Sequence, residues 1–71
     1  MIKALSWTKK GQNLYAIEAF ADTKAEVDAG DPIVGIPDSY EIEMGSSVMT
    51  ADGDIAFRKS DGTWNWVGNN E

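Results

Sequence analysis

The 71-residue chain contains neither cysteine nor histidine. Without cysteine it can form no disulfide, no thiolate nucleophile and no zinc–thiolate site. Without histidine it lacks the commonest metal ligand and the commonest general base. A chain this short buries only roughly 60% of its unfolded surface, so small domains usually gain stability from disulfides, a metal or a partner. The two absences therefore favour assembly, and we expect a homo-oligomer or an assembly subunit.

Basic residues are also scarce, because six lysines and arginines stand against twelve acidic residues, which gives a net charge of −6. An acidic domain repels nucleic-acid phosphates and anionic lipid surfaces. We therefore expect no nucleic-acid partner and no membrane partner. Four basic residues fall on loops or strand ends, where they are either solvated or paired with acids of a partner subunit: Lys9, Lys10, Arg58 and Lys59.

Long apolar runs are missing as well. No stretch approaches the roughly 20 residues of a membrane helix. The first residues have an early Lys3 but no continuous apolar region, which argues against a secretory signal. We therefore expect the chain to be made in the cytoplasm and not to be exported by that route.

Apolar residues instead alternate over short stretches that turn residues separate, a pattern typical of strands. The predicted fold class is all-β, or mostly β with at most one short helix, in a single domain over 1–71. We expect an N-terminal hairpin followed by a short helix or turn in 1–30, a proline-bounded extended segment in 31–46, a three-stranded antiparallel meander in 47–67, and a frayed tail in 68–71.

In the N-terminal part, the stretch 2–7 predicts a strand with Leu5 and Trp7 on one face. The stretch 14–21 is apolar on both faces, which predicts a strand that is covered on both sides or meets another chain. Its alanines make a helix the competing interpretation. Thr23 with Glu26 three residues later forms a capping box for a helix of barely two turns.

The segment 31–46 holds both prolines, and Tyr40, Ile42 and Met44 alternate there with two glutamates. This alternation predicts a half-buried strand or an extended arm lying on a neighbouring subunit. We expect this segment to be the docking element, and the expected partner-binding residues are its apolar ones: Ile33, Ile36, Tyr40, Ile42 and Met44.

The meander is predicted by two Asp-Gly turns, at 52–53 and 61–62. Ile55 and Phe57 share one face of its middle strand, and Trp64 and Trp66 share one face of its last strand. We expect these four side chains to pack together as a small core. The residues that then lie on the other face of the middle strand are Asp54, Ala56 and Arg58.

No catalytic residue, metal site or cofactor is predicted. The acids around Gly53 are explained by the turn, and a calcium loop with its distant bidentate Glu is missing. Glu41 and Glu43 point to a solvated strand face. The serines have no base to activate them, so we expect a protein that is not an enzyme. Trp64 and Trp66 could form a sugar-stacking platform, but the interpretation as core is favoured.

After Pro37, a Gly-Ser step opens a strand, an apolar middle strand follows, and the last strand begins Asp-Gly-x-Trp. Over residues 36–67 this pattern resembles a β-module of small proteins from virions of tailed bacteriophages. The residues that carry it are Gly45, Ser46, Ser47, Asp61, Gly62 and Trp64. It implies a product of the virion structural genes of a phage or prophage of Gram-positive bacteria, without placing the chain in head, tail or fibre.

The leading hypothesis is a non-enzymatic virion structural protein, a head decoration or head-fibre-like subunit that docks on other virion proteins. It would be made in the bacterial host's cytoplasm and would end in the virion. The alternative is a small glycan-binding β module that uses Trp64 and Trp66. A third hypothesis, an acidic inhibitor that mimics DNA, is disfavoured because the acids are dispersed.

Overall fold

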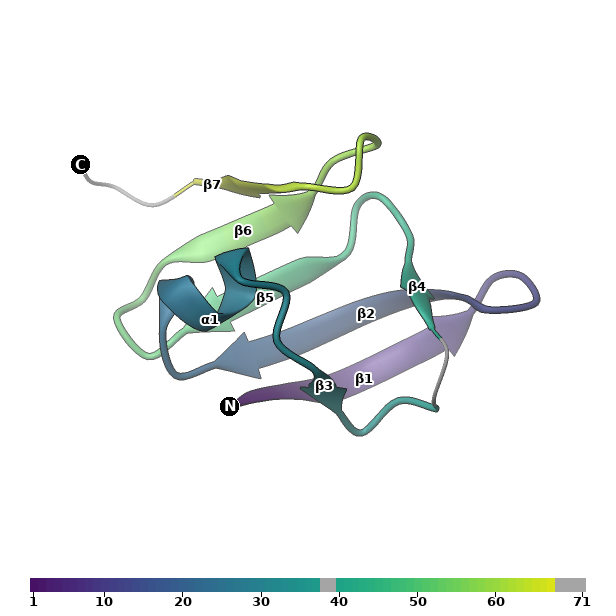
Figure 1. The fold of residues 1–71 in the computed structure, drawn as a ribbon, viewed down its shortest axis with the longest axis horizontal. Coiled ribbons are helices and arrows are strands. Elements are labelled where there is room, and N and C mark those ends of the chain that lie inside the picture. The colour runs from purple at the N-terminus through teal and green to yellow at the C-terminus, as the bar shows by residue number, and fades with distance from the viewer. Residues whose placement is uncertain (38–39, 68–71) are drawn as a thin grey trace.

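A computed structural model of the chain describes residues 1–37 and 40–67, so the expected tail at 68–71 lies outside the described residues. Within these residues seven strands form one mixed sheet, and one short helix lies in front of it (Figure 1). The strand order is β3-β1-β2-β5-β6-β7, and β4 also pairs with β2. The predicted class, mostly β with one short helix, is confirmed. No helix in these ranges is long and apolar enough to cross a membrane.

The N-terminal hairpin consists of β1 (Ile2–Lys9) and β2 (Leu14–Ala21), paired antiparallel. The predicted strand at 14–21 is confirmed residue for residue. The predicted common face of Leu5 and Trp7 is wrong, because the register shifts between Ala4 and Ser6. This irregularity, which resembles a β-bulge, turns the exposed Leu5 out of the alternation and puts Trp7 opposite the buried Ile17.

Helix α1 (Lys24–Asp28) begins at the predicted capping box. The Thr23 hydroxyl accepts a hydrogen bond from the Glu26 N–H, and the Glu26 carboxylate accepts one from the Thr23 N–H. Five residues are too few for a helix to be stable alone. It is held because Val27 is buried against the sheet and the Trp66 indole N–H donates to Asp28 at 3.0 Å.

After α1 the chain crosses the front of the sheet and returns to it twice. β3 (Ile33–Val34) pairs with β1 at the sheet edge, and β4 (Glu41–Ile42) pairs with the first residues of β2; both pairings are parallel. The second half of β2 then pairs in parallel with β5 (Ser47–Thr50). Between these pairings the buried Ser46 hydroxyl accepts the Ile17 N–H at 3.0 Å, so the β2 donor stays satisfied where the strand partner changes.

The C-terminal third continues antiparallel, from β5 to β6 (Ile55–Arg58) and from β6 to β7 (Trp64–Trp66). Both Asp-Gly turns occur where the sequence predicts them. Gly53 and Gly62 have φ of +92° and +88°, which is the left-handed region that favours glycine. The hairpin and this third belong to one sheet because β2 and β5 pair.

The register divides the sheet into two faces with different surroundings. We call the face toward α1 the covered face; it carries the buried core, including Ile17, Val48 and four small residues: Ala4, Ala19, Ala21 and Ala56. We call the other side the open face. The prediction that Ile55 and Phe57 form a core with the two tryptophans is wrong. Trp66 lies opposite Ala56, so Ile55 and Phe57 point to the other face of the sheet. The tryptophans therefore share the covered face with Ala56 and Arg58.

Candidate functional site

The open face carries an apolar patch that no described element covers. Met49, Ile55 and Phe57 keep 46%, 37% and 45% of their surface accessible, although each lies within a strand. In Figure 1, α1 and the chain that follows it lie on the opposite side of the sheet. The open face therefore presents exposed apolar side chains from regular strands without a cover among the described residues.

Strand register brings this apolar patch together. Met49 lies opposite Phe20 on β2 and opposite Ile55 on β6, which makes a row across three strands. The Val67 N–H donates to the Ile55 carbonyl at 2.7 Å, so Val67 continues the row beside β7. Phe57 lies two residues along from Ile55 on the same face. The apolar patch thus consists of Phe20, Met49, Ile55, Phe57 and Val67.

The five residues predicted to bind a partner do not form an exposed arm. Ile33 is buried, and Ile36, Tyr40 and Ile42 are half-buried and pack against the core on the covered face. The Tyr40 hydroxyl accepts the Ile33 N–H at 3.0 Å, which ties the segment to itself. Of the five, only Met44 presents most of its side chain to solvent.

Trp64 and Trp66, the predicted sugar platform, are half-buried and lie against the core. Each indole has a cation over its ring. The Arg58 guanidinium lies 5.1 Å from the Trp64 centroid, and the Lys24 ammonium lies 5.1 Å from the Trp66 centroid. Such contacts occupy ring surface that a sugar would need. Trp7 is more exposed but lies on β1, four strands from β7, where it packs edge-on against Tyr15.

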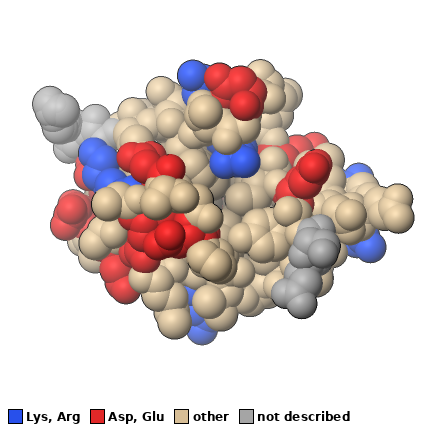
Figure 2. Space-filling view, viewed as in Figure 1, with Lys and Arg blue, Asp and Glu red and all other residues tan. Residues whose placement is uncertain are grey.

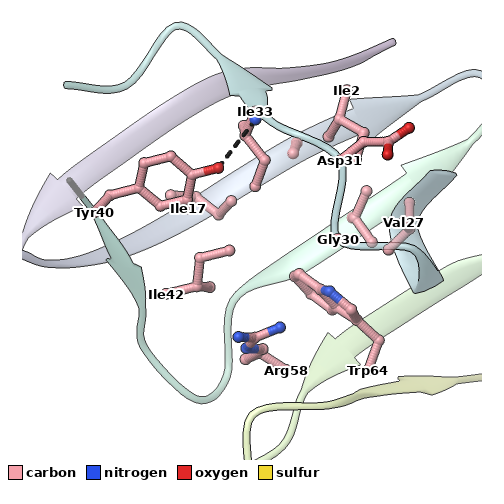
Figure 3. A pocket seen from close by; sticks show the side chains of 12 residues that line it. Ile2, Ile17, Val27, Gly30, Asp31, Ile33, Tyr40, Ile42, Arg58 and Trp64 are labelled. Carbon is pink, nitrogen blue, oxygen red and sulfur yellow. Dashed lines mark hydrogen bonds between the residues drawn. The ribbon is translucent and has the colours of Figure 1, made fainter. Parts of the chain in front are cut away.

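A cavity of about 150 Å³ lies on the covered face (Figure 3). It is bounded by the sheet on one side and, on the other, by α1 and the chain through β3 and β4, which we call the cover. Its walls are apolar side chains from both layers, among them Ile17, Ile42, Val48 and Trp64. Arg58 and Tyr40 also line it. Seen from outside, a small hollow lies beside basic atoms near the middle of this side, while acidic side chains gather over α1 (Figure 2).

Arg58 is the one basic residue that lines the cavity within the described ranges. The sequence predicts it on the outward face of β6, and that prediction is wrong because the pairing with Trp64 places it on the covered face. Its Nε is buried and has no hydrogen-bond partner among the described residues. Buried polar atoms are almost always paired, so this donor marks a place where a ligand atom or water fits.

Three groups at two places in the structure have shifted pKa values. Hydrogen bonds from the Met1 amino group hold the pKa of Glu26 below its usual range, and the same contacts with Glu26 and then Asp22 raise the pKa of that amino group. At the β6–β7 turn, the Thr63 hydroxyl and N–H donate to Asp61 and lower its pKa. These contacts stabilise local structure, namely the start of α1 and the second Asp-Gly turn.

The sequence does not predict the exposed apolar patch, because its pattern places Ile55 and Phe57 in the core. One signal was present: the stretch 14–21 is apolar on both faces, and one of those faces leads through Phe20 to Met49. No family model, no curated protein and no solved structure matches the chain.

Proposed function

We propose that this chain is a non-enzymatic structural protein of a phage or prophage virion, of the head-decoration or head-fibre type. It docks on other virion proteins through the open face of its sheet. The observation that supports the docking mode is the apolar patch, in which strand register gathers exposed side chains on one flat surface. The virion assignment draws on the resemblance of residues 36–67 to phage β-modules.

The size of the molecule supports an interface of this kind. A specific interface buries about 800 Å² on each partner, and the whole chain exposes 4440 Å². An interface of ordinary size would therefore cover about a fifth of the surface. The polar border of the apolar patch consists of Lys3, Glu18, Ser47 and Asn65, which occupy open-face positions next to the patch. An apolar centre with a polar rim is the usual anatomy of a protein interface.

Sedimentation of the purified chain, alone and mixed with heads of the phage or prophage that encodes it, tests the proposal. We expect the wild-type chain to co-sediment with the heads. Met49→Asp places a charge at the centre of the patch, where docking would desolvate it without a partner. It should therefore abolish co-sedimentation while leaving the circular dichroism spectrum unchanged, because the side chain is exposed in the free chain.

Met44→Asp is the matched control. Met44 is also an exposed methionine, at 65% against 46% for Met49, but it lies between β4 and β5 and outside the patch. It should bind heads like wild type. Loss of binding in Met44→Asp with retention in Met49→Asp would return the docking role to the segment 31–46. A wild-type monomer without affinity for heads would overturn the proposal.

A further inference from the structure

We propose that the cavity on the covered face binds a small carboxylate whose body is an apolar group about the size of a six-membered ring. This site lies on the side of the sheet opposite the apolar patch and depends on different residues. It is therefore separate from the docking function and stands or falls on its own test.

The size and lining of the cavity set the body of the ligand. A cavity of about 150 Å³ with walls of aliphatic and aromatic side chains can hold a benzene-sized molecule. Here the walls come from Ile17 and Val48 on the sheet, Ile42 on the cover and Trp64 at one end (Figure 3). Apolar walls with a few polar groups at fixed positions are the usual composition of a small-molecule site.

Arg58 sets the charge of the ligand. Its guanidinium lies at the Trp64 end of the cavity, and its buried Nε lacks a partner among the described residues. The guanidinium presents N–H donors in a planar fork that matches the two oxygens of a carboxylate. A carboxylate at this point would satisfy the Nε donor and pair with the half-buried charge of the guanidinium.

Two further groups orient the ligand. The Tyr40 hydroxyl accepts the Ile33 N–H and so keeps its own proton available to donate. Asp31 lies at the other end of the cavity from Arg58, with its carboxylate directed away (Figure 3). A ligand carboxylate is repelled by Asp31 and attracted by Arg58, so the ring would point toward Asp31 and the charge toward β6.

At its Arg58 end the cavity shares lining residues with a second hollow. Arg58, Tyr40 and Ile42 also border a wider groove of about 600 Å³ between β4 and the β6–β7 turn. Arg58 lines both the cavity and this groove. Glu41, Glu43 and Asp61 add negative charge to the groove, so the attraction of Arg58 for an anion acts at the cavity and not along the groove. The chemical class that fits is an aromatic or compact aliphatic monocarboxylate, with benzoate as the simplest probe.

A titration of the full ¹⁵N-labelled chain with sodium benzoate, followed by NMR, tests the site. We expect saturable shifts of the Arg58 Nε–H, the Trp64 indole N–H and the amides of the lining residues. Benzene, which has the ring without the charge, and acetate, which has the charge without the ring, should each bind at least tenfold more weakly. No saturable shift with benzoate, equal affinity for benzene, or shifts confined to the open face would each overturn the proposal.

Substitutions separate Arg58 from general charge effects. Arg58→Gln should weaken benzoate binding at least tenfold, because a charged hydrogen bond is lost. Lys3→Gln removes an equal charge from an exposed residue on the open face and should leave the affinity within twofold of wild type. Equal weakening by both variants would overturn the specific role of Arg58.

If Arg58→Gln does not fold, Arg58→Lys keeps the charge and removes the planar fork, and it should still lose about tenfold. Wild-type affinity in Arg58→Lys would contradict the fork geometry. A short peptide that ends in a free phenylalanine carboxylate serves as a last probe. Binding of this peptide without binding of benzoate would overturn the small-molecule site in favour of a protein terminus.

Discussion

The two faces of this sheet invert the usual relation between side-chain size and burial. The covered face places alanine at four central positions, whereas the open face carries the apolar patch with its two phenylalanines. Alanine on the sheet leaves room for a cover that brings its own large side chains: Val27, Ile33, Tyr40 and Ile42. The open face has large side chains and no cover among the described residues. The covered face therefore stabilises the fold, whereas the open face is the surface on which we propose that a partner docks.

The sharpest way to break this comparison is to remove equivalent apolar bulk from each face. Ile17→Ala on the covered face should destabilise the chain by about 2–5 kcal/mol, because it deletes buried methyl groups and enlarges the existing cavity. Whole-chain stability for 71 residues is roughly 4–11 kcal/mol, so this variant should be partly unfolded or close to it.

The control for Ile17→Ala is Phe57→Ala, which removes a larger side chain from the open face and should cost less than about 1 kcal/mol. Urea denaturation followed by circular dichroism measures both variants. A larger loss in Phe57→Ala than in Ile17→Ala would show that the open face is part of the core after all.

Adjacent serines allow the same comparison for polar groups. Ser46 is buried and accepts the Ile17 N–H, so Ser46→Ala leaves a buried donor unpaired and should cost about 1–3 kcal/mol. Ser47 belongs to the open face, and Ser47→Ala should stay within about 0.5 kcal/mol of wild type. Thermal unfolding measures the pair, and faster exchange of the Ile17 amide in Ser46→Ala would localise the effect. Equal losses of stability in the two variants would contradict the role of Ser46 as the acceptor for the Ile17 N–H.

The local elements of this fold could be predicted from the sequence, while the choice of faces could not. The capping box at Thr23 and the two Asp-Gly turns depend on neighbours in sequence, and all three occur as predicted. The orientation of β6 depends on a cover from elsewhere in the chain. Ile55 and Phe57 are more apolar than Ala56, so composition alone favours burying them. The opposite result follows from the register, which places Ala56 between Val48 and Trp66 on the covered face.

The candidate sites were hidden for the same reason. A cavity forms where two layers separated in sequence fail to fill the space between them, which no local pattern records. Arg58 would be expected in solvent, and its inward position follows from a cross-strand pairing with Trp64. The parallel pairing of β2 with β5, which extends the open face from Phe20 to Met49, joins segments about thirty residues apart.

Weakening the cover tests how far the covered face depends on α1. Thr23→Ala removes the hydroxyl that accepts the Glu26 N–H and should cost about 1 kcal/mol, the usual value for an N-cap. Thr8→Ala, on the open face of β1, should cost less than about 0.5 kcal/mol. Chemical denaturation gives both values, and increased Trp66 fluorescence quenching in Thr23→Ala would report loosening of α1. No cost in Thr23→Ala would mean that the cover holds without its cap.

The smallest expected change in stability comes from Asp61 in the β6–β7 turn, which belongs to neither face. It serves as the reference for the effects of substitutions on both faces. The Thr63 hydroxyl and N–H, with a lesser contribution from Lys59, lower the pKa of Asp61 below its ordinary value of 3.8. A folded-state pKa below the unfolded one gives stability that is fully present above pH 3.8 and is lost as the pH falls through the folded value. Asp61→Asn should therefore be slightly less stable than wild type near neutral pH, and the difference should vanish in acid.

Thr63→Val tests the cause of this shift directly, because it removes the hydroxyl donor and keeps a β-branched side chain in the turn. NMR titration of the Asp61 carboxyl should give a midpoint below 3.8 in wild type and a higher midpoint in Thr63→Val. Since the group is exposed, solvent screens the interaction, and unfolding midpoints should move far less than in Ile17→Ala. A wild-type midpoint at or above 3.8 would show that the hydrogen bonds from Thr63 to Asp61 do not persist in solution. The turn would then be stabilised by the backbone conformation of Gly62 alone.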